Sequence, residues 1–158
     1  MDIIQLDKPS LNEKQIYGLK VIPLRKIEDE RGAVLHMLRQ DSPHFSQFGE
    51  VYFSKVNYGY VKAWKKHLNM TQHFAVPHGK IKLVCYDNRE NSISKGLLKE
   101  VILGEEHYSL VIIPPEIWYG FQGLSSEYSL ITNCTNYPYD SNEVERVSEN
   151  DSSIPYFW

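Results

Sequence analysis

The feature that most constrains this chain is a succession of short apolar runs, rich in Val, Ile, Tyr, Phe and Leu, separated by turn-forming residues. Runs spaced about 8–12 residues apart, with no long helical period between them, are typical of antiparallel sandwiches, jelly rolls and barrels. No alternation of strands with helices and no glycine-rich nucleotide loop interrupts them. The sequence therefore predicts an all-β fold. The runs span residues 19–24, 32–38, 50–56, 60–67, 72–76, 80–86, 97–103, 108–114 and 128–134.

Composition indicates one globular domain. The chain has 158 residues, of which 42% are hydrophobic and 23% charged, and no linker or internal repeat divides it. We therefore expect a single domain over residues 1–158. The net charge of −3 provides no positive field to hold a phosphate backbone, so nucleic acid is not an expected partner.

The sequence also favours a cytoplasmic protein. Asp2 and Asp7 stand where a secretory signal would carry basic residues before a long apolar run. The longest apolar stretches, such as residues 110–115, are far shorter than the roughly 20 residues needed to cross a bilayer. Cys85 and Cys134 each lie in a strand-like run, so we expect both to be reduced core residues.

The C-terminal region divides into two parts. Residues 141–153 are polar and charged, which predicts a solvated segment with one helical turn. Residues 154–158 are apolar and would be costly to leave in water. We therefore expect residues 141–158 to form a tail that packs on the barrel or on a partner subunit.

Between Gly59 and Gly79 the spacing follows the metal-binding signature of the cupin superfamily, and a counterpart of its second element begins at Pro114. The four ligand positions of that signature are occupied by Lys65, His67, Gln72 and Tyr119. Only one of these is a good ligand at neutral pH, and a lysine ammonium would repel a cation. The sequence therefore predicts a cupin without a metal, which disfavours a metal-dependent dioxygenase or isomerase.

The chain resembles the dTDP-4-dehydrorhamnose 3,5-epimerase family of cupins in a set of stretches that follow the family's order. The resemblance implies a jelly-roll barrel, a homodimer and no cofactor. It also implies epimerisation of a nucleotide-linked 4-keto-6-deoxy sugar at C3, C5 or both, in the synthesis of surface polysaccharide or O-antigen. The matching stretches are residues 29–32, 59–64, 79–89, 113–115, 118–121, 135–137, 150–151 and 154–156.

In that family a base removes the hydrogen next to the C4 ketone, and an acid returns a proton on the opposite face. The family's histidine base falls on Lys65, and its phosphate-contacting arginine falls on Lys62. A second histidine falls on Tyr119, the acid tyrosine on Thr132, and a lysine near Gln72. The aspartate that pairs with the base falls beyond residue 158. The resemblance thus implies the family's pocket with a changed set of catalytic side chains.

Two hypotheses follow for the chemistry. In the first, proton transfer continues with new residues: Lys65 acts as the base or stays charged and stabilises the enolate, or His67 on the same strand face is the base. Tyr119 or Tyr128 then supplies the acid. In the second, the pocket binds a sugar nucleotide without catalysis.

Substrate contacts are expected from residues that can hold phosphate, sugar or base. Arg31 matches a family arginine that grips phosphate, although it can also cap the turn that follows Asp29. Tyr52 can stack on a base or a sugar, or can simply pack in a sheet. The expected substrate-binding set is Arg31, Tyr52, Lys62, Gln72 and Thr132.

Overall fold

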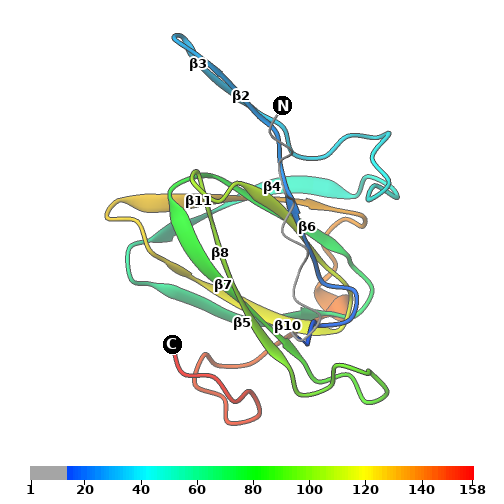
Figure 1. Ribbon diagram of the computed structural model, residues 1–158. Coiled ribbons are helices and arrows are strands. Elements are labelled where there is room, and N and C mark those ends of the chain that lie inside the picture. Colours follow the sequence, from blue (N-terminus) through cyan, green and yellow to red (C-terminus); the bar gives the residue numbers. More distant parts are fainter. Residues whose placement is uncertain (1–13) are drawn as a thin grey trace.

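The computed structural model describes residues 14–158, which form two five-stranded antiparallel sheets and a two-stranded hairpin (Figure 1). The prediction of an all-β fold is confirmed, with one 3₁₀ turn, η1 (Ser141–Glu143), as the only helical element in this range. Within residues 14–158, no helix has the length and apolar character needed to cross a membrane. The strands are β1 (Lys20–Pro23), β2 (Lys26–Asp29), β3 (Gly32–Leu35), β4 (Glu50–Asn57), β5 (Val61–His67), β6 (Gln72–His78), β7 (Lys80–Asp87), β8 (Leu98–Gly104), β9 (Ser109–Ile113), β10 (Ile117–Gly123), β11 (Tyr128–Thr135) and β12 (Val144–Arg146).

The two large sheets pack face to face. The first sheet has the strand order β1-β9-β6-β11-β4, and the second has the order β12-β5-β10-β7-β8. From β4 to β7 each successive strand lies in the other sheet, so the chain wraps around the space between them. This alternation buries one face of each sheet and brings side chains from strands far apart in the sequence together.

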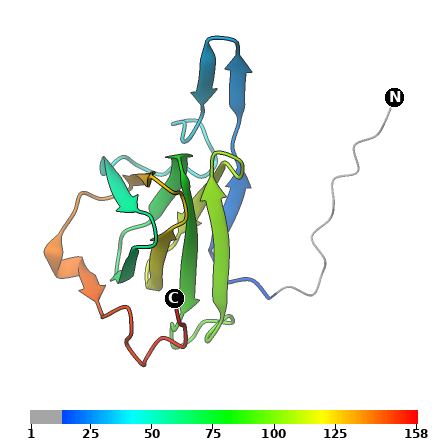
Figure 2. The ribbon, with the colours of Figure 1, turned by 90° about the vertical axis from the view of Figure 1, so that its left-hand side faces the viewer.

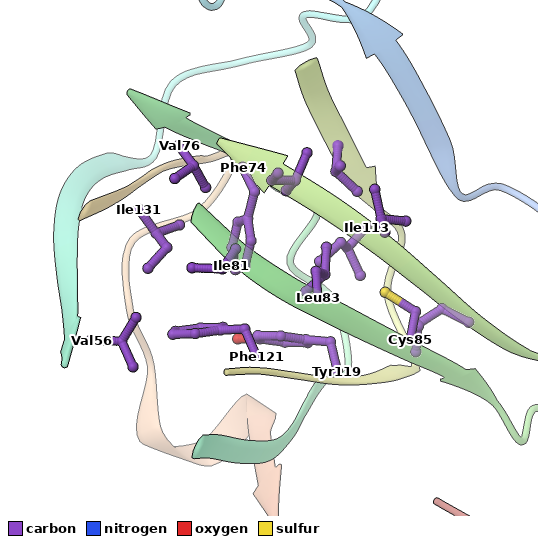
Figure 3. Close-up of a cluster of buried hydrophobic side chains, with 14 of the residues drawn as sticks. Val56, Phe74, Val76, Ile81, Leu83, Cys85, Ile113, Tyr119, Phe121 and Ile131 are labelled. Atoms are coloured by element: carbon purple, nitrogen blue, oxygen red, sulfur yellow. The ribbon is translucent and has the colours of Figure 1, made fainter. Parts of the chain in front are cut away.

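The space between the sheets is filled mainly by apolar side chains that alternate along each strand. In Figure 3, Tyr119 and Phe121 of β10 point into this cluster, towards residues of the neighbouring strands. The Phe74 ring of β6 meets both of them edge-on, at centroid distances of 5.5 Å and 6.3 Å. Each such buried side chain contributes roughly 1.5–3 kcal/mol to folding.

Both cysteines are unpaired. Cys85 is fully buried in this core, as predicted, and burial raises the pKa of its thiol to about 12. Cys134 of β11 is only partly buried.

Strand β10 was missed by the sequence pattern, because two prolines precede it and a glycine interrupts its apolar run. Gly120 is required at this point, because a Cβ there would lie 2.4 Å from the Cβ of Ala63 on β5. The close approach brings β5 against β10, with a register irregularity between Tyr119 and Phe121.

The C-terminal segment packs on the second sheet, although most of residues 141–153 are exposed and η1 is the one helical turn among them. Strand β12 pairs with β5 at the edge of the second sheet, and Glu143 is buried. Beyond it, Ile154 is buried on the outer face of that sheet, and the Trp158 ring lies 5.0 Å from the Trp64 ring. Figure 2 shows this segment running along the second sheet, on the side opposite the β2–β3 hairpin.

Candidate active site

A row of polar side chains crosses the edge of the second sheet. Arg146 of β12 pairs directly with Lys65 of β5, and Lys65 pairs with Tyr119 of β10. Residues that pair directly across strands project from the same face. Because Tyr119 belongs to the core between the sheets, the row faces that interior. His67, two residues beyond Lys65, shares this face.

His67 is held by a carboxylate that the sequence reasoning missed. Its Nδ1 atom is hydrogen-bonded to Oε1 of Glu143, and both side chains are almost completely buried. The second oxygen of Glu143 accepts the backbone N–H groups of Asn69 at 3.0 Å and Met70 at 3.2 Å. Within residues 14–158, Nε2 of His67 makes no hydrogen bond.

The ionisation of Glu143 reflects these contacts. Burial alone raises the pKa of the carboxyl. The hydrogen bonds from His67 and the two N–H groups outweigh burial and hold the pKa below its usual value. Glu143 is therefore a carboxylate near neutral pH and accepts a hydrogen bond from Nδ1 of His67.

Tyr119, on β10, is the innermost residue of the row and is almost fully buried. Its ring stacks nearly parallel to the His67 ring, with centroids 6.2 Å apart. Burial strongly raises the pKa of its phenol, against a smaller opposing effect of a hydrogen bond with Gln72. Tyr119 is therefore a neutral phenol that can donate a hydrogen bond.

The opposite wall comes from the first sheet. Asn133 of β11 donates through Nδ2 to the Tyr52 hydroxyl at 2.9 Å and to Oε1 of Gln72 at 3.0 Å. The hydroxyl proton of Tyr52 thus remains free for another acceptor. Burial raises the pKa of Tyr52 as well. Gln72 and Tyr52, two of the expected substrate-binding residues, thus lie together on this wall, and Asn133 joins them as a residue that the sequence did not reveal.

Lys62 links the two walls. Its side chain donates to the Lys55 carbonyl of β4 at 2.6 Å and to the Ser54 hydroxyl at 3.3 Å. The pKa of Lys65 is lowered by burial, and the charges of Arg146 and Lys62 lower it further. Positive charge therefore collects on this side of the space between the sheets.

Tyr128 and Thr132, predicted as acid and substrate ligand, do not join this group. Alternation along β11 places both on the face opposite to Ile131 and Asn133, which point inward. Lys55 lies over the Tyr128 ring at 4.4 Å on that outer face. Tyr128 and Thr132 share one face of β11, as predicted, but that face points away from the space between the sheets.

Arg31 also lies outside the group. It occupies the turn of the β2–β3 hairpin, which projects away from the two sheets (Figure 1), and its side chain is 83% exposed. Its guanidinium pairs with Asp29 at 2.6 Å.

A hollow of about 920 Å³ adjoins the His67–Glu143 pair, lined by residues of the segment after β11 and by Asn69. Tyr139 in this lining contacts Arg146, its hydroxyl lying 3.4 Å from Nη2. The hollow therefore lies beside Arg146, but Lys65, His67 and Tyr119 do not line it. Among residues 14–158, no three His, Cys, Asp or Glu side chains group so that they could hold a metal ion.

Comparison with known proteins identifies the family and the fold of this chain. Residues 13–158 match the family profile of dTDP-4-dehydrorhamnose 3,5-epimerase. The fold matches the crystal structure of a dTDP sugar isomerase from Desulfovibrio desulfuricans G20, with a TM-score of 0.89 and 49% identity, over 90% of this chain and 92% of that one. The fold and the inward polar group thus define a sugar-nucleotide isomerase with the cupin jelly roll.

Two curated relatives extend the comparison. The chain is 35% identical to the probable low-salt glycan biosynthesis epimerase Agl13 of Haloferax volcanii, over 84% of this chain and 87% of the relative. It is 30% identical to the spore coat polysaccharide biosynthesis protein SpsL of Bacillus subtilis, over 90% of this chain and 96% of the relative. The chain belongs to the dTDP-4-dehydrorhamnose 3,5-epimerase family, which confirms the predicted resemblance and the interpretation as a sugar epimerase.

Proposed function

We propose that this protein epimerises a nucleotide-linked 4-keto-6-deoxy hexose at C3, C5 or both, in the cytoplasm, for the synthesis of a surface polysaccharide such as O-antigen. The family and the roles named for its two curated relatives support this pathway. The observation that carries the chemistry is the grouping of His67, Lys65 and Tyr119 on one inner face, opposite Tyr52.

His67 is the base in this mechanism. Glu143 engages Nδ1, which leaves Nε2 to take the proton next to the C4 ketone. The electrons of the broken C–H bond move into an enolate, whose negative charge lies on the C4 oxygen. The ammonium of Lys65 stabilises that charge, and the phenol of Tyr119 can donate a hydrogen bond to it.

Tyr52 is the acid. Inversion requires the proton to leave one face of the sugar and to return on the other, so base and acid must lie on opposite sides of the ring. His67 comes from the second sheet and Tyr52 from the first. Tyr119 lies on the same sheet as His67, which makes it the weaker choice for this step.

A homodimer and a role for Arg31 belong to the same proposal. Val51 and Phe53 leave apolar surface exposed on the outer face of the first sheet, and Phe53 is 65% exposed. The projecting hairpin carries Arg31 away from the interior of its own chain, so it would reach a substrate phosphate bound by a second copy.

Solvent deuterium incorporation tests the activity. The protein is incubated in D₂O with a dTDP- or CDP-linked 4-keto-6-deoxy hexose, and C3 and C5 are followed by NMR. We expect deuterium at one or both carbons, accompanied by inversion. Tight binding of the sugar nucleotide without exchange at either carbon would replace this proposal with that of a non-catalytic binding protein.

A further inference from the structure

The position of Arg146 suggests a role in holding the substrate. Arg146 pairs with Lys65, so the side chain of Arg146 lies on the inner face of the second sheet, at the open edge that β12 forms. The residue before it, Glu145, points the other way and pairs with Lys66 at 2.7 Å. Arg146 is thus the positive group of β12 that faces the polar row.

Arg146 belongs to a group of three neighbouring cations that lack a counter-ion. Among residues 14–158, neither Arg146 nor Lys65 nor Lys62 forms an ion pair with a carboxylate. Within the part of the chain that the structure describes, the Arg146 side chain hydrogen-bonds only the hydroxyl of Tyr139, and the Lys62 side chain hydrogen-bonds a carbonyl and a hydroxyl.

The acidic groups nearby are engaged elsewhere. Glu143 bonds His67, and Asp140 accepts the backbone N–H of Asn142 at 2.9 Å. Glu50 lies on the opposite wall, where its charge acts on Tyr52. The three cations therefore repel one another without compensation, and an anion bound between them would relieve that repulsion.

We infer that Arg146 binds the diphosphate of the nucleotide sugar, at the edge of the second sheet next to Lys65. A guanidinium offers paired N–H donors that match two phosphate oxygens, which suits this residue better than a lysine. Its exposure at the sheet edge suits the solvent-facing part of the substrate, whereas the sugar lies further in, near His67.

This inference rests on the proposed function for the identity of the anion, but its test needs no turnover. Binding of dTDP is measured by calorimetry at several salt concentrations for the wild type, Arg146→Gln and Arg146→Lys. We expect Arg146→Gln to weaken dTDP binding about tenfold or more and to flatten its salt dependence. Arg146→Lys should keep the salt dependence and recover part of the affinity.

Lys66→Gln is the matched control, because it removes the same charge from the opposite face of the same part of the sheet. It should bind dTDP as the wild type does. The inference is overturned if Arg146→Gln, with a wild-type melting temperature, binds dTDP with unchanged affinity and salt dependence, or if wild type does not bind dTDP at all.

The two proposals fail in different experiments. Loss of dTDP affinity in Arg146→Gln together with no deuterium exchange by the wild type would keep the diphosphate site and reject the epimerase. Deuterium exchange by the wild type together with unchanged dTDP binding in Arg146→Gln would keep the epimerase and reject the diphosphate site.

Discussion

His67 and Glu143, 76 residues apart in the chain, form a buried imidazole–carboxylate pair at the edge of the second sheet. A carboxylate on Nδ1 fixes the ring orientation and the tautomer, and it stabilises the imidazolium that forms when Nε2 takes a proton. The pair joins strand β5 to the segment that follows β11, so it is both a structural link and the chemical centre of the proposed mechanism.

Substitution of this pair should separate catalysis from folding. His67→Gln removes the base, and we expect kcat to fall about 10²–10⁴-fold. Glu143→Gln keeps an oxygen for the N–H groups of Asn69 and Met70 but loses the charge, so a smaller fall is expected. Steady-state epimerisation kinetics and thermal melts measure both effects. Glu145→Gln, two residues away on the other face, should change neither. Wild-type kcat in His67→Gln would reject His67 as the base.

Tyr52→Phe should separate proton removal from inversion. Without the acid, His67 can still remove a proton and return a deuteron from its own face. NMR in D₂O should therefore show exchange at C3 or C5 with little inverted product. Tyr119→Phe should lower the rates of exchange and inversion together, because its phenol acts on the enolate. Equal loss of both processes in Tyr52→Phe would assign the acid to another residue.

Asp87 should control stability in acid. It is fully buried, and although burial raises its pKa, hydrogen bonds from Arg89, Ser92 and Ser94 hold the pKa well below the ordinary value of 3.8. A depressed pKa stabilises the fold at pH values above 3.8, and this contribution is lost as pH falls through the pKa of the folded state. Asp87→Asn should lose about 3 kcal/mol of unfolding free energy at pH 7 and show a weaker decline below pH 4.

Urea unfolding at pH 7 and pH 3 measures both effects of Asp87→Asn. Asp41→Asn is the control, because Asp41 pairs with Arg39 at an exposed position where ion pairs contribute little. A parallel acid decline in Asp87→Asn and the wild type would place the acid-sensitive group elsewhere.

The terminal aromatic residues should differ sharply in importance. The Trp158 ring packs against Trp64 and Tyr156, with both centroid distances 5.0 Å, whereas Phe157 is 96% exposed. Trp158→Ala should lower the unfolding free energy by about 2 kcal/mol, and Phe157→Ala should leave it unchanged. Thermal or urea unfolding compares the two. Equal stability of the two variants would show that the terminal segment does not anchor the sheet.

The all-β fold could be predicted from the sequence because apolar residues at every second position indicate a strand that buries one face. The sequence could not tell which face of β11 points inward. Tyr, Leu and Thr at 128, 130 and 132 are about as apolar as Ser, Ile and Asn at 129, 131 and 133. Tyr128 and Thr132 were expected in the site because the family's acid tyrosine falls on Thr132, and the pattern of β11 gave no signal against that placement.

Only part of the candidate site could be predicted from the sequence. The cupin spacing predicted Lys65, His67 and Tyr119 as site residues, and these three lie on the neighbouring strands β5 and β10. Glu143 and Arg146 lie in a polar stretch whose three-residue strand is too short for periodicity to register. The one hint was His67 itself, because an inward imidazole needs a polar partner when buried.

Because Glu143 and Arg146 both come from residues 140–147, outside the apolar cluster between the sheets, the exposed positions of this short segment can vary without repacking that cluster. Libraries of variants restricted to it offer a direct route to altered substrate choice or reaction outcome. Such libraries would leave the packing of the two large sheets, and the stability that it provides, unchanged.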